Sequence, residues 1–116
     1  MKMSAHYIEI VSNAVDHQCQ VLEKVHGMSF GEAVQELGNA RVSQGENGTL
    51  IGVRAPLAEH DVPIVRTYIA VDDIEKAVKN AEAEGAVIAY PPTKQGVTGT
   101  WAIYIMDDIQ HGLWQK

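Results

Sequence analysis

Hydrophobic and polar residues follow the same order in both halves of the chain. Residues 6–11 (HYIEIV) alternate between apolar and more polar side chains, as a half-buried strand does. Residues 12–27 then carry apolar side chains at roughly helical spacing. The second half repeats this plan, with a strand pattern over residues 65–71 and a helix pattern over residues 72–85. The helix residues predicted to face inward are Val15, Cys19, Leu22 and Val25 in the first half, and Ile74, Ala77, Val78 and Ala81 in the second.

Turn residues mark the ends of these elements. Ser12 and Asn13 are N-cap candidates of the first helix, and Gly27 and Gly85 are predicted to stop the two helices. The prolines at 91–92 are predicted to begin a loop. Each helix is followed by three strand-like segments, which are residues 32–37, 39–44 and 48–55 in the first half and residues 86–90, 99–106 and 111–115 in the second.

Two copies of strand, helix and three strands form an internal repeat, and neither copy could bury both faces of its own sheet. We therefore predict one α+β domain, residues 1–116, built from two βαβββ modules. Module one spans residues 4–56, a polar linker spans residues 57–63, and module two spans residues 64–116. A length of 116 residues suits a single domain with one core.

Composition narrows the possible partners and the compartment. The formal net charge of -6 repels phosphate groups, so we expect neither nucleic acid nor an anionic membrane as a partner. Cys19 is the only cysteine, which excludes an internal disulfide and a metal site of several cysteines. The N-terminal residues lack the apolar run of a signal peptide, and no segment reaches transmembrane length. We therefore expect a cytoplasmic protein.

The repeat, the segment YIAVDDIEKAVKNAEAEGAVIAYPP (68–92) and the closing GLWQ (112–115) together carry a family resemblance. The chain resembles the vicinal oxygen chelate superfamily, which includes glyoxalase I, bleomycin-resistance proteins and extradiol dioxygenases. The resemblance implies two modules whose sheets form a cup-shaped, partly open barrel with the helices outside. It also implies a homodimer, and a divalent metal held by four His or Glu ligands in the metalloenzymes of the superfamily.

Matching strand to strand shows which residues stand at the four implied ligand positions. Three of them are Arg66, Gly52 and Gly112, and the fourth is Tyr7 or His6, depending on a register that the pattern leaves open by one residue. We prefer Tyr7. Glycine has no side chain and guanidinium stays protonated, so we expect no metal and no cofactor at these positions. A histidine site from His6, His60 and His111 is conceivable, but no spacing supports it.

With Tyr7 facing the cup, alternation along the strands predicts which side chains surround a ligand. Gly112 would leave space beside Trp114. Trp101 and Tyr104 are expected on adjacent strands and opposite faces, so at most one of them lines the cup. The predicted ligand-binding residues are Tyr7, Glu9, Arg54, Arg66, Tyr68, Trp101 and Trp114.

These residues support three hypotheses. The first is metal-independent binding of a small aromatic or anionic organic ligand, because aromatic faces and guanidinium groups suit such molecules. The alternative is a lyase or isomerase that acts without the usual metal, with Glu9 as the candidate catalytic base. We rank catalysis lower, because neighbouring cations stabilise an ionised carboxylate and make it a weaker base. In the third hypothesis Glu9 pairs with Arg66 or Arg54, and the aromatic side chains only fill a core.

Overall fold

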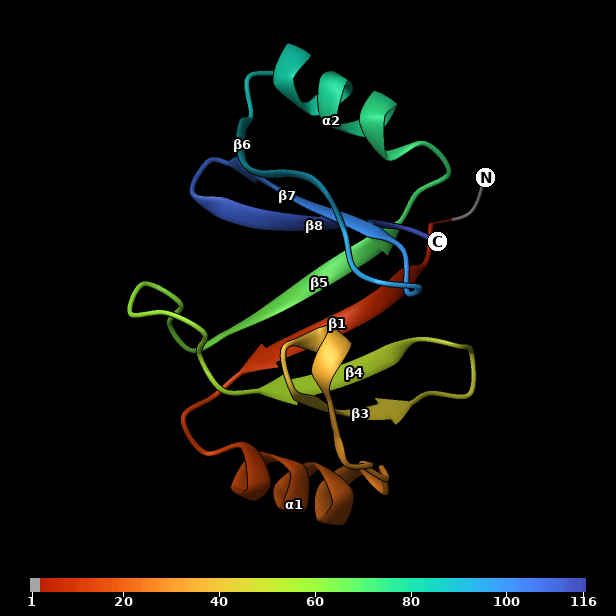
Figure 1. Cartoon of the computed structure of the whole chain (residues 1–116), viewed down its shortest axis with the longest axis vertical. Coiled ribbons are helices and arrows are strands. Elements are labelled where there is room, and N and C mark those ends of the chain that lie inside the picture. Colours follow the sequence, from red (N-terminus) through yellow and green to blue (C-terminus); the bar gives the residue numbers. More distant parts are fainter. Residues whose placement is uncertain (1–2) are drawn as a thin grey trace. The chain divides into compact units, whose positions relative to one another are not determined.

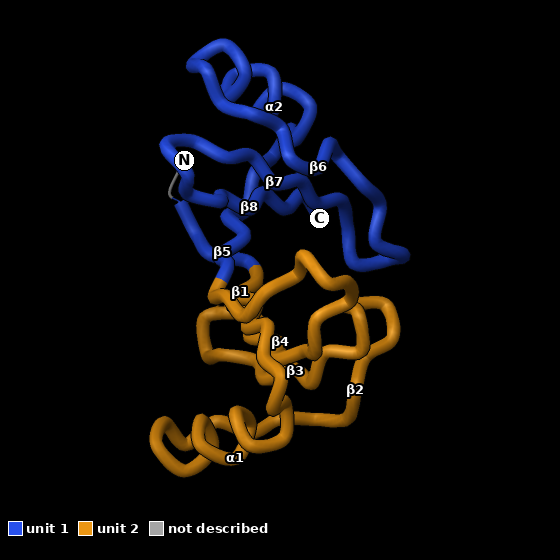
Figure 2. Tube along the Cα trace, turned by 90° about the vertical axis from the view of Figure 1, so that its left-hand side faces the viewer, with its two compact units in different colours: residues 1–6, 66–116 blue, residues 7–65 orange. Residues whose placement is uncertain are grey.

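The structure, a computed structural model, describes residues 3–116. It divides into two compact units, which Figure 2 draws in different colours. One unit consists of residues 7–65. The other combines residues 66–116 with the described residues that precede Tyr7. Each unit is described by itself.

The unit of residues 7–65 is a mixed sheet with one helix. Its elements are β1 (Ala5–Val11, from Tyr7 onward), α1 (Val15–His26), β2 (Ala33–Val34), a 3₁₀ helix (Gln35–Leu37), β3 (Ala40–Gln44) and β4 (Leu50–Arg54). The strand order is β2-β3-β4-β1, of which β3, β4 and β1 are labelled in Figure 1. β1 and β4 are parallel, whereas the other two pairs are antiparallel. In the parallel pair, Glu9 lies opposite Gly52.

The unit of residues 66–116 repeats this arrangement. Its elements are β5 (Ile64–Ala70, from Arg66 onward), α2 (Ile74–Ala83), β6 (Val87–Lys94), β7 (Thr100–Met106) and β8 (Ile109–Gln115). The strand order is β5-β8-β7-β6, with β5 and β8 parallel and the other pairs antiparallel. Tyr68 lies opposite Gly112. The predicted α+β class with two βαβββ modules is confirmed.

α2 covers its sheet as the apolar spacing predicts. The Asp73 side chain caps the helix by accepting a hydrogen bond from the backbone N–H of Lys76 at 3.1 Å. The positive φ of Gly85 follows the last turn. One buried hydrophobic cluster of this unit consists of Ile74, Val78, Ala102 and Leu113.

α1 agrees with the prediction at Cys19, which is fully buried, but not at Val25, which is 67% exposed. Cys19, Leu22 and Val25 follow one another at intervals of three residues, and each interval falls about 60° short of a full helical turn. After two intervals, Val25 therefore lies about 120° around the helix axis from Cys19. The N-cap residue of the helix is Ala14, without a side-chain capping hydrogen bond, rather than Ser12 or Asn13. The backbone N–H of Ser12 still donates to Arg54, which keeps Ser12 at the sheet and delays the helix.

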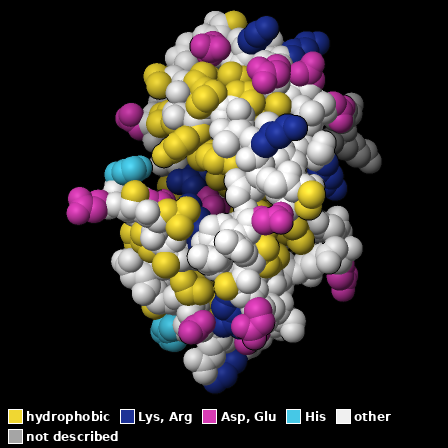
Figure 3. All heavy atoms as spheres, viewed as in Figure 1, with side chains coloured by type: hydrophobic (Ala, Val, Ile, Leu, Met, Phe, Trp, Pro, Cys, Tyr) yellow, Lys and Arg dark blue, Asp and Glu magenta, His cyan; other side chains and the backbone are white. Residues whose placement is uncertain are grey.

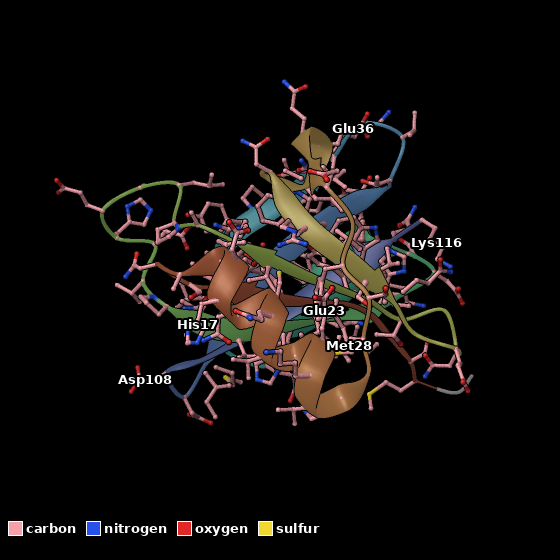
Figure 4. The ribbon with its side chains drawn as sticks, turned by 90° about the horizontal axis from the view of Figure 1, so that it is seen from below. His17, Glu23, Met28, Glu36, Asp108 and Lys116 are labelled. Atoms are coloured by element: carbon pink, nitrogen blue, oxygen red, sulfur yellow. The ribbon has the colours of Figure 1, made fainter. Side chains whose placement is uncertain are left out.

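The segment after α1 is held by the helix itself. His17 and Glu23 project from α1 in Figure 4, and Glu23 Oε2 accepts a hydrogen bond from the backbone N–H of Phe30 at 3.0 Å. Gly27 ends the helix with a φ of 70°, as its position predicts.

Two predicted boundaries are wrong. The strand expected over residues 32–37 is only β2 followed by the 3₁₀ helix, because the turn at Gly38 and Asn39, both with positive φ, closes hydrogen bonds back to Gln35 and Val34. The loop expected at residues 91–92 is part of β6. β6 is the last strand in the order of its unit and has register shifts around these prolines, which is where a strand tolerates residues without an N–H.

Candidate functional site

The pairing registers match the two units residue by residue. Glu9 lies opposite Gly52 as Tyr68 lies opposite Gly112, so Glu9 and Tyr68 occupy equivalent positions. Two residues earlier on each strand, Tyr7 is therefore equivalent to Arg66. The N-caps Ala14 and Asp73 follow Tyr7 and Arg66 at the same distance along the chain. This register supports Tyr7, and not His6, as the counterpart of Arg66.

A tyrosine ring covers the glycine of the last strand in each unit. A Cβ on Gly52 would collide with the phenol end of Tyr7, whose Cζ would be 2.6 Å away. A Cβ on Gly112 would lie 2.6 Å from Cδ2 of Tyr68 and 2.8 Å from the backbone oxygen of Thr67. The prediction that Gly112 leaves space beside Trp114 is therefore wrong. A ring from the neighbouring strand fills the volume that a longer side chain would need.

In residues 7–65, the predicted residues Glu9 and Arg54 belong to an ion-pair network with Asp61. Nε of Arg54 donates to Oε2 of Glu9 at 2.8 Å, and Nη1 donates to Oδ2 of Asp61 at 2.6 Å. The same Asp61 oxygen accepts the backbone N–H of Leu57 at 2.9 Å. The Arg54 and Glu9 side chains are buried, at 8% and 9% exposed. The network thus fastens the loop after β4 to the sheet, and pairs Glu9 with Arg54 as the structural alternative expects.

The carboxylates of this network keep Arg54 charged. Burial alone would lower the pKa of the guanidinium, but its hydrogen bonds to Asp61 and Glu9 more than offset this effect, so the pKa lies above its ordinary value. Burial, followed by the negative charge of Glu9, raises the pKa of Tyr7. Tyr7 is therefore a neutral phenol. Asp61 escaped the sequence analysis because it reaches Arg54 from a polar loop, and no periodic pattern marks such a contact.

In residues 66–116, aromatic rings occupy the equivalent face. Tyr68 meets Trp114 and Trp101 edge to face, with ring centroids 5.6 and 6.4 Å apart. Tyr90 is tilted against Trp101 at 5.5 Å, and His6 against Trp114 at 5.2 Å. We call these five residues the aromatic cluster. The structure thus brings three predicted residues together and adds Tyr90 and His6, which were missed. Alternation could have indicated Tyr90 if the strand had been extended through the prolines.

Exposure differs within the aromatic cluster. Tyr68 and Trp114 are each 4% exposed, whereas Tyr90 is 44% exposed and Trp101 is partly exposed. Tyr104 lies on the same strand as Trp101, which corrects the prediction of adjacent strands, but it packs toward α2 on the opposite face as expected. The accessible aromatic surface of the cluster therefore belongs to Trp101, Tyr90 and the partly exposed His6.

Arg66 lies on the same face of β5 as Tyr68, two residues before it. Its side chain is largely buried, and Nε donates to Oε1 of Gln110 on β8 at 2.9 Å. Gln110 itself is exposed and was not predicted as a site residue. The guanidinium is thus held in place beside the aromatic cluster, with an acceptor oxygen already opposite one of its N–H groups.

No protein-family model and no curated protein matches the chain, but solved structures do. A hypothetical protein from Bacillus halodurans C-125 has a TM-score of 0.77 at 11% identity, covering 100% of this chain and 96% of that chain. Methylmalonyl-CoA epimerase from Mycobacterium tuberculosis has a TM-score of 0.71 at 15% identity, covering 96% and 86%. The Streptomyces coelicolor epimerase in complex with 2-nitronate-propionyl-CoA has a TM-score of 0.67 at 13% identity, covering 97% and 96%.

The likeness to methylmalonyl-CoA epimerase extends over nearly the whole chain. The chain therefore shares the fold of these solved structures. At these identities the likeness concerns the arrangement of the chain, so the chemistry has to be argued from the side chains of this protein.

Four positions of the chain are those at which the family resemblance implies metal ligands. They carry Tyr7, Gly52, Arg66 and Gly112, and tyrosine rings cover both glycines. A neutral phenol and a guanidinium are poor donors for a divalent cation. Within residues 3–116, no three His, Cys, Asp or Glu side chains converge in a way that could hold a metal ion elsewhere.

A groove of about 420 Å³ lies on the helix side of the unit of residues 66–116. It runs between α2 and the strands β7 and β8, where the rings of Tyr104 and His111 stack 4.9 Å apart. None of its lining residues belongs to the aromatic cluster.

Lys and Arg side chains are scattered over the face of the molecule that Figure 3 shows. Within residues 3–116, no helix has the length and apolar character needed to cross a bilayer.

Proposed function

We propose that this protein binds a small organic ligand with a flat apolar part and an acidic group, without using a metal ion. The observation that carries the proposal is the combination, on one face of residues 66–116, of the aromatic cluster with a buried, oriented Arg66. Flat molecules stack on aromatic rings, and guanidinium recognises carboxylates through paired hydrogen bonds.

Gln110 indicates how the acidic group is received. Its side-chain oxygen accepts the Nε–H of Arg66 at 2.9 Å, and the residue is exposed. A ligand carboxylate therefore replaces the amide oxygen while Gln110 swings outward. A charged acceptor makes a stronger hydrogen bond to guanidinium than a neutral amide does, which favours the exchange.

The tyrosine rings that cover the glycines support metal independence. Installing a longer side chain at Gly52 or Gly112 would first require Tyr7 or Tyr68 to move. Arg66 carries a positive charge at a third expected ligand position, which repels a cation. These features support a site that works through its own side chains.

The similar structures fit a ligand of this kind. They include methylmalonyl-CoA epimerases in complex with 2-nitronate-propionyl-CoA and with methylmalonyl-CoA and NH4+. Both CoA compounds are acidic organic molecules. We also propose a homodimer, as the family resemblance implies, and expect it to appear as a doubled mass.

Native mass spectrometry and tryptophan fluorescence test the proposal together. Titration with 2-naphthoate should quench the emission of Trp101 and Trp114 saturably, with and without a chelator. Arg66→Gln should weaken binding at least about tenfold, because a charge-assisted hydrogen bond contributes roughly 1.5–3 kcal/mol. Gln110→Ala should leave the affinity equal or higher, because it removes the competing acceptor.

Three controls make the result decisive. Arg41→Gln removes an arginine that pairs with Asp16 in the other unit, and should not change the affinity. His111→Ala alters the groove beside α2 and should not change it either. Arg66→Lys keeps the charge if Arg66→Gln does not fold. Absence of saturable quenching, or a stoichiometric metal in the native mass, would refute the proposal and, in the first case, favour a scaffold with a filled core.

Catalysis by Glu9 is the second candidate function, and the geometry argues against it. Oε2 of Glu9 accepts a hydrogen bond from Arg54 at 2.8 Å inside a buried network that fastens a loop. A carboxylate paired in this way stabilises the fold. An isomerase or lyase activity that Glu9→Gln abolishes, while the fold and the unfolding midpoint stay unchanged, would restore this candidate.

A further inference from the structure

Both tryptophans of the chain donate their indole N–H groups to one short loop. Nε1 of Trp101 donates to Oε1 of Gln95 at 2.8 Å, and Nε1 of Trp114 donates to the backbone oxygen of Thr98 at 2.9 Å. The two residues lie opposite each other on β7 and β8. Gln95 and Thr98 belong to the loop between β6 and β7, residues 95–99, which we call the indole loop.

The indole loop is shaped to receive these donors. The backbone N–H of Gln95 donates to Gly99 at 2.8 Å, and the backbone N–H of Thr98 donates to Gln95 at 3.0 Å, which closes a compact turn. Gly99 has a φ of 130°, and a Cβ there would lie 2.7 Å from Nε1 of Trp114. Only glycine combines this backbone angle with such a close approach to the indole. The loop thus holds both rings in fixed orientations.

We propose that the indole loop determines the ligand specificity of this site, an inference that rests on the proposed function. Because the loop takes both indole N–H groups, the accessible ring of Trp101 offers a ligand only carbon edges and a π face. A hydrogen-bond acceptor in the part of the ligand that lies against this ring would be buried without a partner. The acidic group of the ligand is recognised at Arg66. The ligand class is an aryl or polyene carboxylate without ring heteroatoms.

Gln95 is the positioning residue in this arrangement. It is the one loop residue that binds an indole through its side chain, because Thr98 uses its backbone oxygen. Removing the Gln95 side chain frees the N–H of Trp101, which then becomes a donor for a ligand acceptor. A ligand acceptor buried without a partner weakens the free energy of binding, whereas an acceptor that receives the freed N–H does not. The variant should therefore discriminate less against ligands that contain a heteroatom.

The test compares 2-naphthoate with quinoline-6-carboxylate, which has the same shape but one ring nitrogen in place of a CH group. The wild type should prefer 2-naphthoate by at least about fivefold, which corresponds to one unpaired acceptor of roughly 1 kcal/mol. Gln95→Ala should reduce this preference to less than about twofold. Gln95→Glu keeps an acceptor oxygen and should restore it. The exposed Gln18→Ala on α1 serves as the matched control and should leave the preference unchanged.

A second measurement needs no ligand. In a Trp114→Phe background, Trp101 is the only tryptophan, so Gln95→Ala should shift its emission maximum and Gln95→Glu should not. Equal preferences in the wild type and Gln95→Ala, or an unchanged emission, would overturn the role of the indole loop while 2-naphthoate binding still upholds the proposed function. Absence of binding to either compound would overturn the proposed function itself.

Discussion

The two units place different chemistry on equivalent backbone positions. Beside Gly52 in residues 7–65 lies Glu9, and two residues after that glycine comes Arg54. Beside Gly112 lies Tyr68, and two residues after it comes Trp114. The first face is closed by the Glu9–Arg54–Asp61 network. The second is formed by edge-to-face rings.

This difference separates a structural face from the face that we propose to bind a ligand. Buried charges have to be paired. The polar groups of the ion-pair network therefore bind one another and the backbone of the loop that carries Asp61. In aromatic side chains only the N–H and O–H groups need a hydrogen-bond partner when they are buried. Trp101 and Tyr90 remain partly exposed. The repeat therefore gives the chain one face that holds it together and another that is suited to a ligand.

The largest expected effect comes from breaking the ion-pair network. Arg54→Ala removes the shared partner of the buried Glu9 and the partly buried Asp61, and should lower the free energy of unfolding by about 3–5 kcal/mol. Trp114→Phe at the equivalent position keeps the ring packing, so it should cost roughly 1 kcal/mol or less beyond its lost N–H bond. Urea unfolding of both variants measures the contrast. Similar losses would mean that the two faces do not differ in the way we describe.

The next largest effect concerns the covered glycines, which resemble each other but differ in what surrounds them. Gly112→Ala should destabilise the protein by about 2–3 kcal/mol, because its Cβ meets the backbone oxygen of Thr67 as well as the ring of Tyr68. Gly52→Ala meets only the far end of the Tyr7 side chain.

A pair of double-mutant cycles separates these two cases. Tyr7→Ala should recover about 1 kcal/mol or more of the loss caused by Gly52→Ala, because it removes the one obstacle. Tyr68→Ala should recover less of the loss caused by Gly112→Ala, because the backbone oxygen stays. Equal coupling in the two cycles would contradict the geometry.

Sequence reasoning found the parts of this comparison that depend on local periodicity. Apolar spacing predicted both helices, and counting along the chain from Asp73 placed Arg66 on the correct face. It also brought Tyr68, Trp101 and Trp114 into one candidate site before any of their contacts was visible.

The parts that sequence reasoning missed depend on residues far apart in the chain. Periodicity shows that Gly112 has no side chain, but not that the ring of Tyr68 occupies the space. Asp61 and Gln95 lie in loops, where no repeat restricts their direction, and each is bound to a strand residue that only the folded chain brings close. The pairing registers of the strands could be assigned only from the hydrogen-bond pattern of the sheet.

A smaller effect involves His6, the histidine of the aromatic cluster. Burial, together with the positive charge of Lys116, holds the pKa of its imidazole below the ordinary value of 6.5. The unfolded chain therefore binds a proton more readily, so this contribution to stability is present above pH 6.5 and is lost as the pH falls through the folded-state value.

His6→Asn isolates this contribution. The difference in unfolding free energy between the wild type and the variant should shrink as the pH falls from about 7.5 to about 5. His17→Asn changes an exposed histidine on α1 of the other unit and serves as the matched control for the substitution itself (Figure 4). A parallel pH dependence of the wild type and His6→Asn would rule out a role for this imidazole.

The smallest expected effect is that of metal removal, and here the two units should agree. Neither Gly52 nor Gly112 offers a donor atom, and rings from β1 and β5 cover both positions. A metal present at a hundred times its dissociation constant would stabilise the folded chain by about 2.7 kcal/mol, which is easily measured. Adding zinc, manganese or nickel, or dialysing against a chelator, should leave the unfolding midpoint unchanged. A metal-dependent increase that Arg66→Gln or Tyr7→Phe removes would show that the covered positions still receive an ion, and that the strand matching between the units is mistaken.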